Sequence, residues 1–431
     1  MREVEKYWVK QLLKGVVLAA GIGKRLRPIT ETRPKALVPI LGKKLIEYPM
    51  NFLKLFGLEE IVVVVGYMAE CVEAELTKLC EELNLHCVFT KQEQELGTGH
   101  ALKIALKKVG GEDVVLVYGD LFLDPAASRK LRQVVDKVKS RDMVVGVIKV
   151  DDVSRYAYVK VVNGVVKELV EKPKVRQPGY ANAGVYFIPS KHLELVEQLE
   201  ISPRGEYELT DLVVNAVRRN ERVYTFELEQ DEWMDVGLPW LIIEANKLAL
   251  NKWGKKLILG DVEPTATIKG PVIIEENARV RGSTYIMGPA YIGRDADVGP
   301  NSFIRPYTVI CEGARIGFSV EVKESVVFED VHAAHLAYIG DSVVAEHVNL
   351  GAGTKLANLR FDGKNVKVTI EGKRIDSGRR KLGAIIGGYV KTGINVSIMP
   401  GVRIGSYSII YPGVTVYRDV PSRTVVKHDW V

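Results

Sequence analysis

The stretch that decides the architecture is Ile268–Ile310, IKGPVIIEENARVRGSTYIMGPAYIGRDADVGPNSFIRPYTVI. An apolar residue stands at every sixth position, and Gly, Asp, Glu, Arg, Pro and Ser fill most positions between. This period fits neither the helical repeat of about 3.6 residues nor the two-residue alternation of a strand. It is typical of a β-helix, in which each face of a coil places one apolar side chain inward. The sequence therefore predicts a stack of parallel coils.

The sixfold spacing continues beyond this stretch. Its stops are Ile268, Ile274, Val280, Ile286, Ile292, Val298, Ile304, Ile310, Ile316, Val322 and Phe328. The phase falters at Ala334, resumes at Ile339, Val344 and Leu350, and returns at Ile386, Ile398, Ile404, Ile410 and Val416. A β-sandwich would place turn signals about every 8–12 residues, and here they come more often. We therefore predict that 262–431 form the β-helix, apart from one insertion.

This ladder resembles the left-handed hexapeptide β-helix of acyltransferases and their non-catalytic relatives. The resemblance implies a left-handed coil, a homotrimer, and acyl donors bound between neighbouring prisms. Within the insertion, Val366–Ile370 and Lys373–Ile375 flank Glu371-Gly372, which predicts a hairpin.

Composition favours small anionic substrates. The net charge is +6 with 26% charged residues, and no polybasic run indicates nucleic acid or a membrane as partner. No apolar stretch approaches the ~18 residues of a membrane span, and the charged start, Met1–Lys14, does not read as a signal peptide. The four cysteines lack metal-ligand spacing, which favours a reducing cytoplasm, although a Cys80–Cys87 bond stays open because hyperthermophiles form intracellular disulfides.

The first half of the chain alternates strands with amphipathic helices. Strands are predicted at Gly15–Ala20, Ile61–Val65, His86–Thr90 and Val114–Tyr118, and helices along 71–83, from Thr98, at Leu209–Val217 and at Pro239–Leu250. Asn163-Gly164 predicts a tight hairpin turn. Such alternation implies βαβ units and a mostly parallel, Rossmann-like mixed sheet. We therefore divide the chain into an extension (1–14), an α/β domain (15–240), a linker helix (241–261) and the β-helix (262–431), each domain with its own core.

A phosphate site is predicted beyond the carboxyl ends of these strands, where ligands bind in open α/β sheets. Gly21 and Gly23 follow the first strand and let backbone amides approach an anion. Arg25 and Lys35 add positive charge. Asp120 and Asp235 would hold Mg²⁺, which prefers carboxylates and substrate phosphates. A glycine turn and two helix-capping aspartates are the alternative, and only the combination favours a nucleotide site.

The motif LAAGIGKRLRP (Leu18–Pro28), followed by Pro34-Lys35, resembles the signature of sugar-1-phosphate nucleotidylyltransferases. The resemblance covers 15–240 and implies that Ala20, Gly21 and Gly23 bind nucleotide while Arg25 and Lys35 hold the triphosphate. It also implies that Asp120 and Asp235 hold the metal and that Glu171 and Asn182 hold the sugar. Ala157 stands where the family commonly has Gly, which puts the shape of the sugar pocket in doubt.

Gln92, with Gly97 and Thr98 in LGTGHA, resembles the uracil-reading segment of the UDP-N-acetylglucosamine branch of that family. An amide can donate to and accept from a pyrimidine edge. The alternative is a surface glutamine in the polar run Lys91–Glu95.

A second site is predicted where the hexad phase slips. His335 lies there, with Arg305, Lys323, Asn349 and Asn358 nearby in the repeat. A lone histidine is usually structural, but polar neighbours and an ordinary histidine pKa of about 6.5 favour a general base.

The stretch HLAYIGD (His335–Asp341) resembles the acetyltransferase half of the bacterial bifunctional enzyme that acetylates and then uridylylates glucosamine-1-phosphate. The resemblance implies that His335 is the base, that Arg305, Lys323 and Tyr338 grip the sugar phosphate, and that Asn349 and Asn358 orient the sugar. Acetyl-coenzyme A would meet the backbone near Ala352. Residues Arg360–Lys381 look more like archaeal homologues; there Lys364, Lys367 and the run Arg379–Lys381 either meet coenzyme A phosphates or form a solvated loop.

The sequence thus predicts a bifunctional enzyme that uses acetyl-coenzyme A, UTP and Mg²⁺ to make UDP-N-acetylglucosamine. Two alternatives stay open. One is a hexose-1-phosphate nucleotidylyltransferase, using UTP or dTTP, whose β-helix only assembles trimers. The other is a non-catalytic scaffold shaped like a nucleotidyltransferase.

Overall fold

The computed structural model describes residues 13–139 and 141–428. These form two compact units, the first holding residues 13–22 and 45–235, the second holding residues 23–44 and 236–428. The predicted extension 1–14 lies outside the described residues except for Leu13 and Lys14, which begin the first strand.

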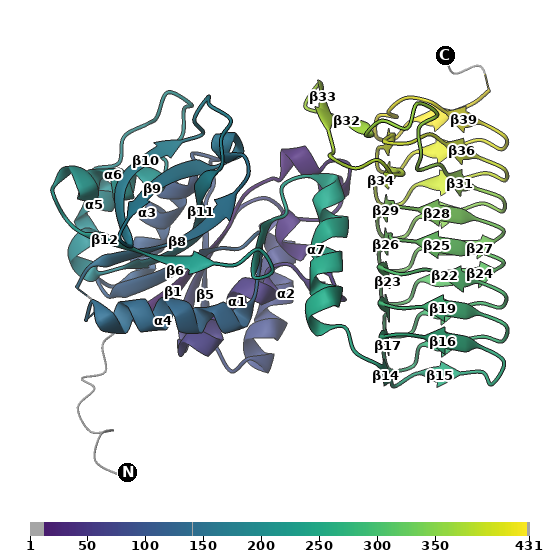
Figure 1. Cartoon of the computed structure of the whole chain (residues 1–431), viewed down its shortest axis with the longest axis horizontal. Coiled ribbons are helices and arrows are strands. Elements are labelled where there is room, and N and C mark those ends of the chain that lie inside the picture. Colours follow the sequence, from purple (N-terminus) through teal and green to yellow (C-terminus); the bar gives the residue numbers. More distant parts are fainter. Residues whose placement is uncertain (1–12, 140, 429–431) are drawn as a thin grey trace, which may run out of the picture. The chain divides into compact units, whose positions relative to one another are not determined.

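The first unit is built on a nine-stranded mixed sheet with the order β5-β4-β1-β6-β11-β8-β12-β10-β9 (Figure 1). Its strands are β1 (Leu13–Ala19), β4 (Glu60–Val65), β5 (His86–Lys91), β6 (Asp113–Tyr118), β8 (Met143–Val150), β9 (Ala157–Val162), β10 (Val165–Glu171), β11 (Gly179–Ile188) and β12 (Val223–Leu228). Strands β5, β4, β1 and β6 run parallel, whereas β11 joins β6 and β8 in antiparallel fashion. The predicted hairpin is confirmed, since Asn163 and Gly164 both have positive φ between β9 and β10.

Helices cover the sheet because its central strands, β1, β4, β6 and β8, are apolar on both faces. They are α1 (Glu47–Phe56), α2 (Ala69–Glu82), α3 (Thr98–Val109), α4 (Ser128–Lys137), α5 (Glu194–Glu197) and α6 (Thr210–Arg218). One buried cluster joins α3, α5 and α6 to the sheet, with Leu102 and Leu212 fully buried in it. A separate two-stranded ribbon pairs β7 (Leu121–Leu123) with β13 (Trp233–Asp235).

The second unit is a left-handed hexapeptide β-helix with three sheets of parallel strands (Figure 1). One sheet stacks β14 (Leu257–Ile258), β17 (Val272–Ile274), β20 (Ala290–Ile292), β23 (Thr308–Ile310), β26 (Val326–Val327), β29 (Val343–Val344), β34 (Ile385–Ile386) and β37 (Arg403–Ile404). The next stacks β15 (Asp261–Val262), β18 (Arg279–Val280), β21 (Asp297–Val298), β24 (Arg315–Phe318), β27 (His332–His335), β30 (Asn349–Leu350), β35 (Lys391–Thr392), β38 (Ile409–Ile410) and β40 (Val425–Val426). The third stacks β16 (Thr267–Lys269), β19 (Tyr285–Met287), β22 (Phe303–Ile304), β25 (Glu321–Lys323), β28 (Tyr338–Gly340), β31 (Lys355–Leu356), β36 (Ser397–Ile398) and β39 (Thr415–Val416).

The register explains the sixfold period and its slip. Ile268 pairs with Ile286, so one coil spans three sixfold steps. Val309 pairs with Val326, so the coil there is one residue shorter. The interior cluster therefore takes Val327, and the predicted interior position of Phe328 is wrong. Phe328 is buried outside that cluster, beneath the guanidinium of Arg33, 5.1 Å from its ring. The slip begins at this shortened coil, before Ala334.

Three further elements belong to the second unit. Helix α7 (Pro239–Trp253) confirms the predicted helix and starts with a proline in its first turn. The predicted hairpin in the insertion is β32 (Lys367–Ile370) paired with β33 (Lys373–Asp376). Segment Gly23–Lys44 contains the short ribbon of β2 (Pro39–Ile40) and β3 (Lys43–Lys44).

Arg33 anchors the segment Gly23–Lys44 on the β-helix. Its side chain, 13% exposed, donates two hydrogen bonds to Glu329 at 2.7 and 3.2 Å and pairs with Glu346 at 3.3 Å. The sequence predicts that each domain is self-contained. The structure instead groups the segment that bears Arg25 and Lys35 with the β-helix.

Cys80 and Cys87 form a disulfide that links the end of α2 to β5, a bond that the sequence left open. Cys71 and Cys311 are free thiols. None of the helices in the described part of the chain combines the length and apolar character that a membrane crossing needs.

Candidate functional site

The glycine loop after β1 has the backbone that its sequence predicts. Gly23 has φ 68°, and a side chain there would come within 3.1 Å of Lys35 Cβ and 3.2 Å of Thr30 Cγ2. The Thr30 hydroxyl also donates to the Gly23 carbonyl at 2.9 Å. A Cβ at Gly21 would meet no protein atom within 4 Å, so its backbone faces open space. The loop therefore leaves room for an anion at Gly21. Arg25 is exposed, and Lys35 is buried at the start of a short 3₁₀ helix.

The two predicted metal-binding carboxylates lie on neighbouring strand ends. Asp120 directly precedes β7, and Asp235 in β13 pairs with Leu121 at the start of β7. The ribbon therefore brings the two aspartates to one end of the first unit. Across residues 13–139 and 141–428, no group of three or more His, Cys, Asp or Glu side chains is placed to hold a metal. Two carboxylates together with substrate phosphates are a set that suits Mg²⁺, and the arrangement fits that ion.

Gln92 is buried, so the interpretation as a surface glutamine is wrong. Its amide nitrogen donates to the Gly97 carbonyl at 3.1 Å and to His100 Nδ1 at 3.0 Å. These bonds use both hydrogens of the Gln92 amide. The amide oxygen therefore remains available to accept a hydrogen bond from a nucleobase. Burial, followed by the charges of Lys103 and Lys107, lowers the pKa of His100, which favours the neutral ring that has an acceptor nitrogen.

Gly97 and Thr98 hold the start of α3. Gly97 has φ 91°, and a side chain there would lie 2.6 Å from the Tyr207 carbonyl oxygen. The Thr98 hydroxyl accepts from the Leu209 amide at 3.1 Å. Both residues therefore fix the loop between Gln92 and the helix.

The predicted sugar residues Glu171 and Asn182 lie in the same unit. Glu171 ends β10, opposite Ala157 in β9, and accepts from Arg204 at 3.2 Å and from Thr210 at 3.2 Å. Asn182 lies at an irregularity in β11, where its oxygen accepts from the Gly184 amide at 3.1 Å and its nitrogen donates to Tyr186 at 2.5 Å. A polar group therefore stands at each of the two predicted positions.

Sequence reasoning missed Arg204 and two tyrosines beside these residues. The hydroxyls of Tyr118 and Tyr186 lie 3.5 Å apart, and burial raises the pKa of Tyr118 to about 12. A side chain on Gly184, which has φ 72°, would come within 2.6 Å of the Tyr118 ring. The glycine in Asn182-Ala183-Gly184 was the available signal, because it allows this close approach.

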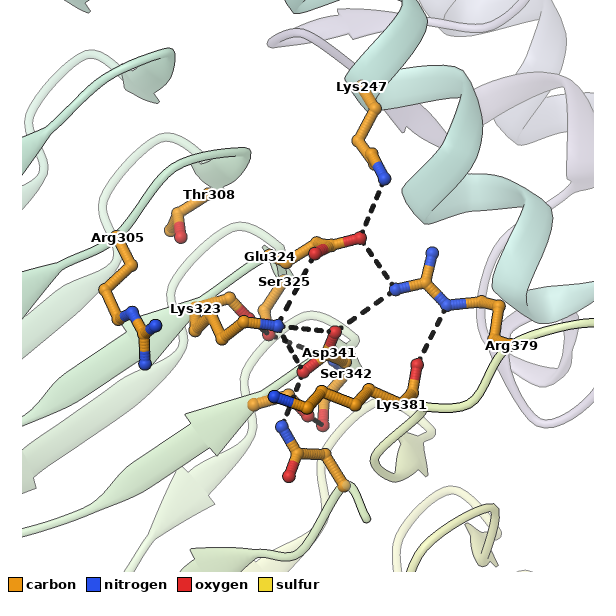
Figure 2. A network of polar contacts seen from close by, with 12 residues as sticks. Lys247, Arg305, Thr308, Lys323, Glu324, Ser325, Asp341, Ser342, Arg379 and Lys381 are labelled. Carbon is orange, nitrogen blue, oxygen red and sulfur yellow. Dashed lines mark hydrogen bonds and ion pairs between the residues drawn. The ribbon is translucent and has the colours of Figure 1, made fainter. Parts of the chain in front are cut away.

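Three polar residues of the predicted acetyl-transfer site meet around Asp341 on the β-helix. Lys323 in β25 donates to both oxygens of Asp341, at 2.8 and 2.9 Å. Asn358 donates to Asp341 at 2.5 Å and to the Tyr338 hydroxyl at 3.0 Å. Figure 2 shows Lys323 pointing at Asp341. The structure thus brings Lys323, Tyr338 and Asn358 together around a carboxylate that sequence reasoning did not single out.

The other predicted residues surround this cluster less directly. His335 is exposed at the end of β27, one corner before Tyr338, and Phe318 is its partner in β24. Asn349 is exposed in β30. Arg305 pairs with Glu321 at 3.0 Å and lies apart from Asp341 in Figure 2.

The residues predicted for coenzyme A lie on two segments. The Ala352 carbonyl accepts from the Asn395 amide at 2.8 Å, while Lys364 and Lys367 are exposed on the insertion. Arg379 is 12% exposed and pairs with Glu244, Glu324 and Asp341. It therefore serves an internal network, and Arg380 and Lys381 are the exposed members of that basic run.

Family models match most of the chain. The nucleotidyl transferase model matches residues 14–252. The GMPPB C-terminal domain model matches residues 286–373, and six bacterial transferase hexapeptide repeats match residues 383–418.

Curated relatives match over nearly the full length. A bifunctional sugar-1-phosphate nucleotidylyltransferase/acetyltransferase of Sulfurisphaera tokodaii is 45% identical, over 95% of this chain and 98% of its own. A "Bifunctional protein GlmU" of Methanocaldococcus jannaschii is 40% identical, over 96% of this chain and 97% of its own. A bacterial protein of that name, from Carboxydothermus hydrogenoformans, is 28% identical, over 97% of this chain and 100% of its own.

Proposed function

Because the chain belongs to the family of bifunctional sugar-1-phosphate nucleotidylyltransferases/acetyltransferases, we propose that it catalyses both reactions in sequence. It acetylates glucosamine-1-phosphate with acetyl-coenzyme A, then transfers a uridylyl group from UTP to N-acetylglucosamine-1-phosphate. The second reaction releases pyrophosphate and yields UDP-N-acetylglucosamine.

The observation that carries this proposal is the cluster of Lys323, Tyr338 and Asn358 around Asp341, on a chain that also keeps a nucleotidyl transferase domain. A β-helix that only assembled trimers would have no need of a polar cluster built around a buried carboxylate, because such a group is costly to bury. A non-catalytic scaffold is also disfavoured, because the chain keeps Arg25, Lys35, Asp120 and Asp235.

In nucleotidyl transfer, a phosphate oxygen of the sugar phosphate attacks the α-phosphorus of UTP, and pyrophosphate leaves in line. Both reactants are anionic, so positioning and charge neutralisation supply most of the catalysis. Arg25 and Lys35 would hold the triphosphate, Gln92 the uracil, and Glu171 and Asn182 the sugar. Mg²⁺ bound by Asp120 and Asp235 would neutralise the phosphates.

In acetyl transfer, the free amine of glucosamine-1-phosphate attacks the thioester carbonyl carbon. A C–N bond forms, the C–S bond breaks, and the amine proton passes through His335 to the leaving thiolate. Lys323, Tyr338 and Arg305 would hold the phosphate, while Asn349 and Asn358 would orient the sugar. Coenzyme A would meet the backbone near Ala352, with Lys364 and Lys367 available to its phosphates.

The relative from Sulfurisphaera tokodaii is named for sugar-1-phosphates in general, which keeps a broader sugar range as a second candidate. Ala157, opposite Glu171, is the position in this chain where such a difference would arise. The hexapeptide repeats support a homotrimer, and the substrates UTP and acetyl-coenzyme A support a cytoplasmic setting.

The test is a matrix of assays on the purified protein. Glucosamine-, galactosamine-, glucose- and N-acetylglucosamine-1-phosphate are each given UTP or dTTP, and the amino sugars are given acetyl-coenzyme A. We expect coenzyme A release with glucosamine-1-phosphate and pyrophosphate release with N-acetylglucosamine-1-phosphate and UTP. A protein that releases pyrophosphate but never coenzyme A would be a nucleotidylyltransferase alone.

A further inference from the structure

Asp341 follows β28 at a corner of the β-helix and is 1% exposed. A buried carboxylate is costly unless cations and hydrogen-bond donors surround it. Here both oxygens are used. Oδ1 accepts from Lys323 at 2.8 Å and from Arg379 at 3.2 Å, and Oδ2 accepts from Lys323 at 2.9 Å and from Asn358 at 2.5 Å.

Asp341 and its neighbour Glu324 share an ionic network whose cations come from β25, α7 and the insertion (Figure 2). Arg379, from the end of the insertion, also pairs with Glu324 at 2.8 Å and with Glu244 on α7. Lys247 on α7 pairs with Glu324 at 2.9 Å. Burial alone would raise the pKa of Glu324, but the hydrogen bond from Lys247 and the charge of Arg379 lower it to about 2. The network therefore holds Asp341 among fixed charges.

We infer that Asp341 is a positioning residue for the sugar-phosphate pocket of the acetyl-transfer site. This inference rests on the proposed acetylation of an amino-sugar phosphate. Asp341 accepts from Asn358 Nδ2, and the same nitrogen donates to the Tyr338 hydroxyl at 3.0 Å. With both hydrogens so used, the Asn358 oxygen is the atom that can accept from the sugar. Asp341 thus sets which end of the amide the substrate meets, and it holds the Lys323 ammonium in place.

The substitution Asp341→Asn would reverse this arrangement with little change in shape. Donors from Lys323, Arg379 and Asn358 converge on two carboxylate oxygens, but an asparagine offers one oxygen and one NH₂ group. Where the NH₂ group of the new asparagine faces Asn358, the side-chain amide of Asn358 must turn to present its oxygen. Its nitrogen would then face the sugar, and the polarity of that hydrogen bond would be inverted.

The matched control is Glu324→Gln. Glu324 belongs to the same ionic network and touches Lys247, Arg379 and, at 3.5 Å, Lys323. These contacts involve neither Asn358 nor Tyr338. If the network were purely structural, both substitutions would have the same effect. If Asp341 positions the pocket, only Asp341→Asn changes the binding of the sugar phosphate.

The experiment measures KM and kcat of acetyl transfer in the full-length protein. It also measures calorimetric binding of glucosamine-1-phosphate without a donor, together with the thermal midpoint. For Asp341→Asn we expect the KM and Kd for glucosamine-1-phosphate to rise about 10- to 100-fold, as the loss of charge-assisted bonds implies. The KM for acetyl-coenzyme A and the uridylyl transfer should stay within about twofold. Glu324→Gln should lower the thermal midpoint but leave both KM values within about twofold.

Each outcome decides one of the two proposals. If the wild type acetylates and Asp341→Asn keeps the wild-type KM and Kd, Asp341 is structural and the inference fails while the function stands. If the wild type binds glucosamine-1-phosphate without acetylating it, the proposed function fails, and the Kd of the variant still decides the role of Asp341. If the wild type neither binds nor acetylates, both fail.

A second variant covers the case in which Asp341→Asn does not fold. Asp341→Glu keeps the negative charge that the buried cations require but displaces it by one C–C bond, about 1.5 Å. We expect a smaller rise in the same KM and Kd, about 3- to 10-fold. An unchanged KM in this variant overturns the inference.

Discussion

The two candidate sites are assembled from the chain in opposite ways. The nucleotidyl-transfer residues lie on segments as far apart as Ala20 and Asp235, at the ends of strands that are not neighbours in sequence. The residues proposed to bind the sugar phosphate and act as base in acetyl transfer lie between Arg305 and Asn358, mostly on coils stacked in register. Glu321, for instance, pairs with Tyr338, and Tyr338 pairs with Lys355. One set of residues comes from strand ends of the sheet and from the segment Gly23–Lys44, and the other mainly from repeated coils.

This difference has a consequence for substitutions. A residue at a strand end in the α/β unit has few repeats around it, so its loss should affect one chemical step. On the β-helix, His335 shares strand β27 with a second exposed histidine, His332, so a control residue stands close by.

The largest effect is expected for the predicted metal ligands. Asp120→Ala or Asp235→Ala removes a carboxylate from the pair that the β7–β13 ribbon brings together. A bound metal supplies several kcal/mol of charge stabilisation, so pyrophosphate release should fall at least about 10⁴-fold. Coenzyme A release should continue, because no metal is needed to move an acetyl group from a thioester.

Asp231→Ala, at an exposed position four residues before Asp235, is the control and should retain activity. EDTA should mimic the two active-site variants in the pyrophosphate assay. Full uridylyl transfer in EDTA would contradict the assignment of a metal to this pair.

The next effect concerns His335. The amine of glucosamine-1-phosphate must lose a proton as the tetrahedral intermediate forms, and a positioned base is worth ~10²–10⁴-fold. His335→Ala should lose acetyl transfer by about that factor, with little change in KM for acetyl-coenzyme A. Uridylyl transfer to preformed N-acetylglucosamine-1-phosphate should not change.

His332 provides the matched control for this variant. It is also exposed and lies on the same strand, β27. His332→Ala should acetylate at the wild-type rate. Equal losses in the two variants would mean that the strand, and not the base, was disturbed.

A third prediction asks whether the phosphate loop depends on the β-helix. Arg33→Met would leave Glu329 and Glu346 without their buried cation, at a cost of about 3–5 kcal/mol. The thermal midpoint measured by calorimetry should fall by roughly 10 °C. Arg27→Met, at an exposed position in the same segment, should leave the midpoint unchanged.

A fragment of residues 1–250 extends this third test. It lacks both glutamates, so the segment Gly23–Lys44 would lose the partners of Arg33. We expect the fragment to lose nucleotidyl transfer even where its sheet folds. Wild-type activity in the fragment would show that Arg25 and Lys35 do not need the β-helix.

The periodic parts of the fold were predictable from sequence. A six-residue spacing determines inward positions in any β-helix, and Asn163-Gly164 favours the left-handed backbone of a tight hairpin. The position of Phe328 was not predictable from sequence, because removing one residue from a coil moves every later side chain to a new position. The shortened coil has no mark in the sequence beyond a Val-Val pair at Val326 and Val327.

The charged contacts were also beyond sequence reasoning. Motifs located Lys323 and Tyr338, but no local pattern says that Asp341 and Arg379 meet them, since these residues come from different coils and from the insertion. Arg33 likewise precedes the motif Pro34-Lys35 without any sign that its partners lie about 300 residues away. Ion pairs have no period, so they appear only once the fold is known.

The smallest effect is expected at Gln92. Gln92→Ala removes the amide oxygen that would accept from the N3–H of uracil, and it leaves Gly97 O and His100 Nδ1 without their donor. Losing such bonds in a dry pocket costs about 1–3 kcal/mol, so the KM for UTP should rise about 5- to 150-fold. The KM for the sugar phosphate should hardly change.

The control is Gln94→Ala, which replaces an exposed glutamine on the same loop and should behave as wild type. Because uracil and thymine share the N3–H donor and cytosine lacks it, the ratio of UTP to CTP turnover should fall in Gln92→Ala, while the ratio of UTP to dTTP turnover should not. An unchanged ratio of UTP to CTP would place base selection elsewhere in the unit, and a fallen ratio of UTP to dTTP would mean that Gln92 senses more than this one edge of the base.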